Sequence, residues 1–177
     1  MVRWQRLVRS RIPPAEVRAQ LALRRGEQIL TVGYDPEGGC ALVATDRALH
    51  RRAGADGWSR LGWELITRVR WDRTDGRLVI TGLPGIAPPR TVVPLRDRGV
   101  LPELAEERIS YTRLGCWTVN FDGQRHVPAE ARRRPVTGEL LWVISPPGGL
   151  DLRDRDVRDQ IGEAIAQLRD DLGIPPG

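Results

Sequence analysis

Few residues of the types that perform catalysis or bind metals occur in this 177-residue sequence. It contains two histidines, His50 and His126, and two cysteines, Cys40 and Cys116. Each histidine lies alone in a strand-like segment, where a packed or surface role is commoner than a catalytic one. Both cysteines accompany apolar residues, so we interpret them as small buried hydrophobic residues and not as nucleophiles. Two cysteines are also too few for a disulfide framework or a four-ligand zinc site.

Three carboxylates near the end of the chain have a spacing that could suit a cation. Asp151, Asp154 and Asp156 come directly before a helical pattern, where carboxylates accept hydrogen bonds from free backbone N–H groups and favour the helix dipole. We interpret them as helix-start residues. The sequence also lacks a Gly-x-Ser-x-Gly elbow, a phosphate-binding glycine loop and a His-Glu-x-x-His helix. We therefore expect no enzymatic activity, no cofactor and no metal ion.

Arginine and tryptophan side chains remain as the candidates for contacting a partner. All 28 basic residues are arginine, which we attribute first to the codon bias of a high-GC, bacterial genome. The planar guanidinium group nevertheless suits phosphate and carboxylate ligands. Core packing is the first explanation for most of the tryptophans, but Trp58 lies in an expected loop and could be an exposed anchor. Residues 132–134 are expected to form a basic loop. The candidate partner-binding residues are Arg3, Trp4, Arg6, Arg9, Trp58, Arg60, Arg132, Arg133 and Arg134.

The positive charge is concentrated in the first 25 residues, which hold seven arginines against Glu16 alone. Residues 150–177 are acidic instead, with seven carboxylates against four arginines. Trp4, Leu7 and Val8 could form one side of a short amphipathic turn that inserts into an anionic membrane. We favour the alternative, in which this arm packs on its own domain and faces the acidic last helix, because so short a helix is unstable alone.

Hydrophobic periodicity and turn residues predict a mainly β chain with some helix, an α+β fold. The continuous apolar run 40–45 predicts a strand that is buried on both faces. Residues 63–71 alternate as one strand, with Ile66 as the only apolar residue on its polar face. A short helix is expected after Pro14, and longer ones over 101–109 and 154–172. The expected strands are 28–34, 40–45, 48–52, 63–71, 77–81, 90–95, 115–121, 124–132 and 139–144.

Two stretches, LVATDRALH at 42–50 and RLGWELITRV at 60–69, resemble the bacterial pleckstrin-homology-like (PH-like) domains. The resemblance covers about residues 26–110 and consists of an apolar strand, a Thr-Asp-Arg corner, a second strand and an apolar-aromatic-acidic-x-Ile segment. It implies a bent antiparallel sheet or split barrel, here elaborated by extra strands and capped by a C-terminal amphipathic helix. Either 101–109 or 154–172 could be that helix. Relatives that bind phosphoinositides use a basic first loop, whereas residues 35–39 here are acidic, which argues against phosphoinositide binding by that loop.

These patterns divide the chain into three parts. Residues 1–25 form a basic arm with a short helix, 26–110 the PH-like domain, and 111–177 a three-stranded extension with a helix, packed into the same globule.

No apolar run is long enough to span a membrane, and arginines at positions 3, 6 and 9 interrupt any signal sequence. We expect a non-catalytic cytoplasmic binding or adaptor domain for a protein partner. The alternatives are anionic-membrane binding through the arm, and nucleic-acid binding through the arm with Arg132–Arg134.

Overall fold

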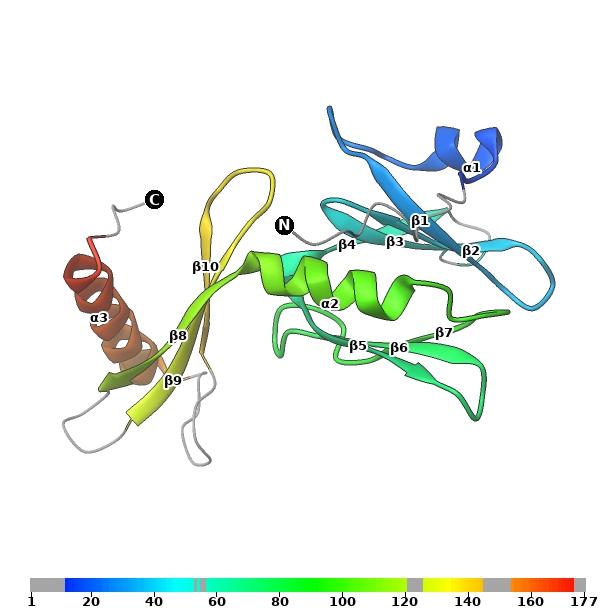
Figure 1. Ribbon diagram of the computed structural model, residues 1–177. Coiled ribbons are helices and arrows are strands. Elements are labelled where there is room, and N and C mark those ends of the chain that lie inside the picture. Colours follow the sequence, from blue (N-terminus) through cyan, green and yellow to red (C-terminus); the bar gives the residue numbers. More distant parts are fainter. Residues whose placement is uncertain (1–11, 53, 55–56, 121–125, 145–153, 174–177) are drawn as a thin grey trace, which may run out of the picture. The chain divides into compact units, whose positions relative to one another are not determined.

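The computed structural model describes residues 12–52, 54, 57–120, 126–144 and 154–173. The chain divides into two compact units, Met1–Thr112 and Arg113–Gly177, which are called the first and second unit below. The described residues form three antiparallel sheets with a few helices, so the expected mainly β, α+β class is confirmed (Figure 1). The packing of the expected parts into one globule stays a prediction. No helix in these described ranges is long and apolar enough to cross a membrane.

The first unit contains a four-stranded and a three-stranded antiparallel sheet, each with its strands in chain order. A short helix, α1, precedes the sheets and a longer helix, α2, follows them (Figure 1). The bounds are α1 Ala15–Gln20, β1 Ile29–Tyr34, β2 Cys40–Thr45, β3 Ala48–Arg52, β4 Trp58–Gly62, β5 Ile66–Asp72, β6 Arg77–Gly82, β7 Thr91–Pro94 and α2 Leu101–Thr112.

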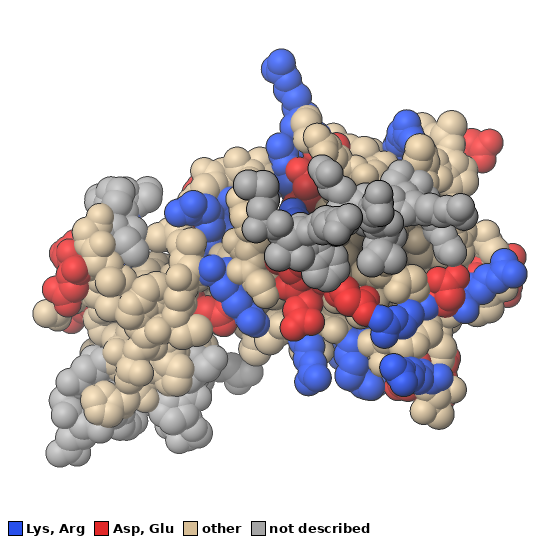
Figure 2. Space-filling view, viewed as in Figure 1, with Lys and Arg blue, Asp and Glu red and all other residues tan. Residues whose placement is uncertain are grey.

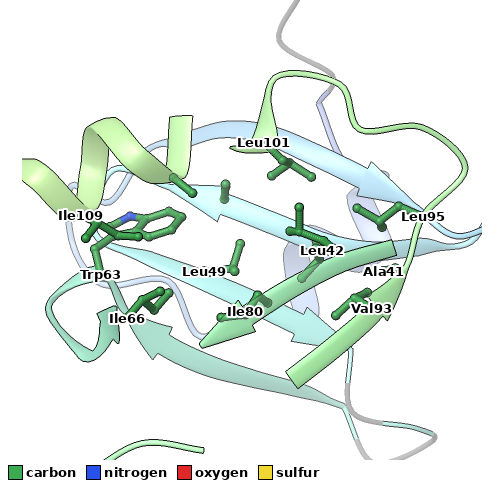
Figure 3. Packing of buried hydrophobic residues seen from close by; sticks show 13 residues of the cluster. Ala41, Leu42, Leu49, Trp63, Ile66, Ile80, Val93, Leu95, Leu101 and Ile109 are labelled. Atoms are coloured by element: carbon green, nitrogen blue, oxygen red, sulfur yellow. The ribbon is translucent and has the colours of Figure 1, made fainter. Parts of the chain in front are cut away.

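The main hydrophobic core of the first unit lies between the two sheets and α2 (Figure 3). Leu101, Ala105 and Ile109 recur at intervals of four and form the apolar stripe of α2 that enters this core. Each large side chain buried here stabilises the fold by about 1.5–3 kcal/mol. The helix over these sheets is therefore α2. The buried members of the core are Ala41, Leu42, Ala44, Leu49, Trp63, Ile66, Leu78, Ile80, Val93, Leu95, Leu101, Ala105 and Ile109.

The opposite, outer face of the four-stranded sheet has a second apolar cluster. Leu21, at the end of α1, packs there with Val32, Cys40 and Val43, and Val17 of α1 is partly buried beside them. All six residues of β2 are buried. The prediction that this strand is covered on both faces is confirmed.

The region around Trp63 differs from the single strand expected over 63–71. The chain first forms β4, then one 3-10 turn at Trp63–Leu65, and only then β5. A register shift between Ile66 and Arg68 leaves Thr67 as an extra residue opposite β6. This bulge turns Ile66 into the core, against which Val69 is also packed, so the apolar exception in the alternation is a core residue.

The second unit is a three-stranded antiparallel sheet with one long helix. Its bounds are β8 Arg113–Asn120, β9 His126–Arg133, β10 Leu140–Ile144 and α3 Arg155–Asp171, with β9 in the centre of the sheet. Val157, Ile161 and Ile165 of α3 pack against Val127 and Ile144 of the sheet. The expectation that the C-terminal helix caps the PH-like sheets is wrong, because its apolar stripe packs on β9 and β10, whereas α2 packs on the first-unit core.

Two of the three carboxylates considered as cation ligands, Asp154 and Asp156, lie at the start of α3. Asp154 is the N-cap residue, and its Oδ1 accepts a hydrogen bond from the backbone N–H of Asp156 at 3.0 Å. This is the helix-start role expected from the sequence. Asp151 lies outside the described residues.

Candidate functional site

A pocket of about 280 Å³ opens in the first unit beside the end of β3 and the edge strand β7. The charged residues in its lining are Arg51, Arg52 and Asp35. Ala41 and Val93, both members of the buried core, supply part of its apolar lining. The pocket therefore combines charged and apolar surface, as sites for small ligands or single side chains do.

The sheet register fixes the position of Arg51. Arg51 of β3 lies directly opposite Leu42 of β2, and such cross-strand neighbours share a face of the sheet. Leu42 is completely buried in the core, so Arg51 lies on the same, core-facing side of the sheet. At the end of β3 this side of the sheet forms part of the pocket. Within the described part of the chain, no ion pair joins Arg51 or Arg52 to a carboxylate. Their charge is available to an anionic ligand.

Asp35 has a structural task in the loop between β1 and β2. Its Oδ1 accepts a hydrogen bond from the N–H of Gly39 at 2.7 Å, and its own N–H donates to the Gly39 carbonyl. The carboxylate thereby closes the turn expected at residues 35–39. The lining of the pocket thus contains Arg51, which continues the inner face of the sheet, Arg52 next to it, and one carboxylate that is already hydrogen-bonded.

A separate polar cluster centred on Glu27 is buried in the first unit. The Glu27 side chain has no exposed surface. Its Oε1 accepts a 2.6 Å hydrogen bond from the Thr45 hydroxyl, while Oε2 accepts one from the N–H of Arg24 at 3.0 Å. His50 Nε2 lies 3.3 Å from Glu27 Oε1, and Arg60 Nη2 lies 3.7 Å from it.

The partners of Glu27 decide which groups of this cluster are charged. Burial by itself would raise the pKa of Glu27, but hydrogen bonds from Thr45, Arg24 and His50, with the charge of Arg60, lower it. Burial lowers the pKa of His50, against the opposing effect of Glu27. At neutral pH the cluster thus holds a carboxylate beside a neutral imidazole. The Glu27 and His50 side chains at its centre are buried, so we assign the cluster to stabilising the fold.

The Thr-Asp-Arg corner, residues 45–47 between β2 and β3, also stabilises the fold. The Thr45 hydroxyl donates a hydrogen bond to Glu27, as described above. Asp46 Oδ1 accepts a hydrogen bond from the Gln28 N–H at 2.8 Å, and Arg47 Nη1 donates one to the Arg25 carbonyl at 3.1 Å. All three side chains therefore hold the segment before β1 against the corner.

The predicted partner-binding residues of the first unit are not brought together. Arg3, Trp4, Arg6 and Arg9 lie outside the described residues. The expectation that Trp58 is an exposed loop anchor is wrong: it begins β4, packs on the outer cluster and donates from Nε1 to Gln20 Oε1 at 3.3 Å. Arg60, in the same strand, belongs to the Glu27 cluster.

The three arginines expected to form a basic loop have three different environments. Arg132 and Arg133 are the last residues of β9. Arg132 is completely buried, with Nε 2.9 Å from Glu130 Oε1, and Arg134 pairs with Glu139 at 3.5 Å. The expectation of a basic loop is therefore wrong for Arg132 and Arg133, because both are strand residues. Strand pairing and Glu130 also hold Arg132 inside the fold. Arg133 is exposed.

The two cysteines also differ from each other. Cys40 is buried as expected, and burial raises the pKa of its thiol to about 11. Cys116 is exposed, so the expectation that it is buried is wrong. Its cross-strand neighbour is the charged Glu130, which places Cys116 on a less apolar part of the sheet than its neighbour Trp117.

Figure 2 shows that arginines are spread over the visible face, with acidic side chains between them, and are not gathered into one groove. Among the residues that the structure describes, no three His, Cys, Asp or Glu side chains lie close enough to hold a metal ion. Comparisons with protein-family models, curated proteins and solved structures find no match to this chain. The function is therefore inferred from the geometry of the chain itself.

Proposed function

We propose that the first unit is a PH-like domain. Two features support this proposal. The four-stranded sheet is followed by a three-stranded sheet and then by α2, whose apolar stripe lies in the shared core, in agreement with the bent, helix-plugged sheet that the resemblance implies. The Thr-Asp-Arg corner also lies between two consecutive strands, and its side chains tie the chain together there.

We further propose that the protein is a non-catalytic cytoplasmic binding or adaptor protein that holds an acidic segment of a protein partner. The observation that carries this is the pocket with Arg51 and Arg52 beside an apolar lining. A space of about 280 Å³ suits one acidic side chain and not a helix or a duplex. The chain's net charge of +5 favours an anionic partner, and the free Cys40 and Cys116 suit a reducing compartment.

The test is binding of a fluorescently labelled octaglutamate peptide, followed by fluorescence anisotropy. We expect binding that weakens as salt is raised, because the Debye length falls to about 10 Å at 0.1 M salt. The double variant R51Q/R52Q should lose this binding. The matched control, R18Q/R73Q, removes the same charge from two exposed positions and should bind nearly as well as the wild type.

Two results would contradict this proposal. Equal loss in the control variant would mean that the peptide responds only to net charge. Absence of peptide binding, together with binding to phosphatidylglycerol vesicles that disappears when residues 1–12 are removed, would favour the membrane alternative. Duplex DNA, added as a third probe, examines the nucleic-acid alternative, which the burial of Arg132 weakens.

A further inference from the structure

The edge strand β10 of the second unit consists of five consecutive apolar residues, LLWVI. Each of them is only partly buried, and among the described strands β10 pairs with β9 alone. Ile144 packs with α3, and the register places Trp142 on that same face, while Leu141 and Val143 share the other. The strand is thus apolar on both faces. Such an edge is a template for a further strand unless something protects it.

The other five edge strands of the described sheets each carry a protecting feature. Edges are commonly protected by charged side chains, proline, bulges or short length. Here β1 has two register shifts, β4 contains Arg60, β5 contains Arg68 with a bulge, β7 contains Pro94, and β8 has a register shift beside Arg113. In contrast, β10 carries no charge, proline, glycine or register shift.

The hydrogen-bonding groups of this free edge follow from the hairpin. The Arg134 N–H donates to the Glu139 carbonyl at 2.9 Å, next to the first β9–β10 pair. Hydrogen-bonded and non-bonded pairs alternate in an antiparallel ladder, so the backbone groups of Leu141 and Val143 point toward β9. Those of Leu140, Trp142 and Ile144 therefore point away from it, which gives the free edge three donors and three acceptors.

We propose that β10 pairs with β10 of a second copy of this chain, antiparallel about a twofold axis at Trp142. This register places Leu140 opposite Ile144 of the second copy, and Trp142 opposite its counterpart. These are the residues whose backbone groups point outward, so every free donor meets an acceptor. The side chains are also compatible in this register. Leu141 lies opposite Val143 of the second copy, so every cross-strand pair is apolar.

Charge favours a second copy at β10 over self-pairing at the other edges. The sequence of β10 has no charged residue, so its symmetric pairing brings no like charges together. Self-pairing of β4 or β5 would bring arginines of the two copies together, which destabilises a sheet. The pairing forms a continuous six-stranded sheet with the two α3 helices on the same face. It is an isologous contact, which closes as a dimer.

The size of the contact determines its expected strength. Five residues of strand extend about 17 Å, and pairing along this length buries less than the roughly 1,200 Å² of a standard interface. We therefore expect a reversible dimer whose fraction rises with concentration, and not an obligate one.

Sedimentation equilibrium of the full chain tests the proposal. The wild-type mass should rise with concentration from 19.8 kDa toward twice this value. The variants L141K/V143K and L141E/V143E should each stay monomeric, because like charges then lie opposite one another across the axis. An equimolar mixture of the two should associate again, because opposite charges then meet. The matched control C116K/T118K alters two exposed positions on the other edge strand and should dimerise like the wild type.

Several outcomes would overturn the proposal. These are a monomeric wild type at every concentration, a dimer that persists in both charged variants, or a mixture that stays monomeric although both variants show wild-type circular dichroism. If the charged variants do not fold, hydrogen exchange of the wild type tests whether β10 is the interface. The amides of Leu140, Trp142 and Ile144 should become more protected as concentration rises, and unchanged protection in a sample that dimerises would place the interface elsewhere.

Discussion

At the scale of single residues, Glu27 shows how a buried charge is retained in this fold. Its partners Thr45 and His50 lie 18 and 23 residues further along the chain. No local pattern around Glu27 could have indicated this cluster, because the contacts exist only once the four-stranded sheet has formed. The Thr-Asp-Arg corner was recognised in the sequence, but its hydrogen bonds could not be assigned without the segment that it holds.

Replacing Glu27 by glutamine should destabilise the protein. The substitution removes the charge that accepts hydrogen bonds from Thr45 and Arg24, and hydrogen bonds to charged groups contribute about 1.5–3 kcal/mol. Urea unfolding measures the loss. Glu16→Gln, at an exposed position of α1, is the matched control and should change stability by less than about 0.5 kcal/mol. A Glu27→Gln variant as stable as this control would contradict the assigned role.

The cluster should also make stability depend on pH. Burial lowers the pKa of His50 in the folded state from its ordinary 6.5, although Glu27 opposes this and Arg60 adds to it. The unfolded chain therefore binds the proton first, and stability that is present above pH 6.5 is lost as the pH falls toward the folded value. The pKa of Glu27 is lowered from 4.5, so a second loss follows below pH 4.5.

Unfolding free energies at pH 7.5 and 5.5 measure the histidine contribution separately. The wild type should be less stable at pH 5.5, and His50→Gln should reduce this difference. His126→Gln, at an exposed position of β9, should leave it unchanged. A pH dependence that is the same in the wild type and in both variants would contradict the contribution of His50.

The two cysteines should react at very different rates. Cys40 is buried and its thiol has a pKa raised to about 11, so little thiolate is present at pH 8. Cys116 is exposed. A disulfide reagent under native conditions should modify one thiol rapidly, and Cys116→Ser should remove this fast phase. Fast labelling that persists in Cys116→Ser would show that β2 opens readily.

At the scale of secondary structure, prediction succeeded where one hydrophobic pattern was decisive. The bounds of β2 and β3 match those expected, because a continuous apolar run and a turn define them. The strand β4 was missed, since Ser59 and Gly62 have low strand propensity and Trp58 follows a glycine loop. Its pairing with β3, which local sequence does not encode, makes it a strand.

The packing of α2 predicts which helical substitution is damaging. Ile109 is buried in the core of the first unit, so Ile109→Ala should cost about 2–5 kcal/mol. Leu172, just after α3, is 41% exposed, and Leu172→Ala should cost less than about 0.5 kcal/mol. Thermal melting of both variants checks this. Similar melting temperatures would mean that α2 does not stabilise the sheets.

At the scale of the whole chain, the helix that closes the first unit could not be chosen from the sequence. Both 101–109 and 154–172 show a helical apolar stripe, and the stripe of α3 is the longer one. The choice depends on contacts between distant segments, since Ile109 meets core residues from both sheets whereas Ile161 meets Val127. The candidate pocket was missed for the same reason, because Arg51 and Val93 come together only across the two sheets.

The difference between the two cores predicts unequal local stability. Among the residues that the structure describes, the main core of the first unit buries thirteen apolar residues, whereas the cluster under α3 buries two, Val127 and Ile161. Local opening is easiest where few apolar contacts resist it. In dilute solution, amides of β8, β9 and β10 should exchange faster than those of β2, β3 and β6, as measured by hydrogen–deuterium exchange. Equal exchange rates would contradict this. Since pairing of β10 with a second copy adds hydrogen bonds only to the second unit, the difference should become smaller as the protein concentration rises.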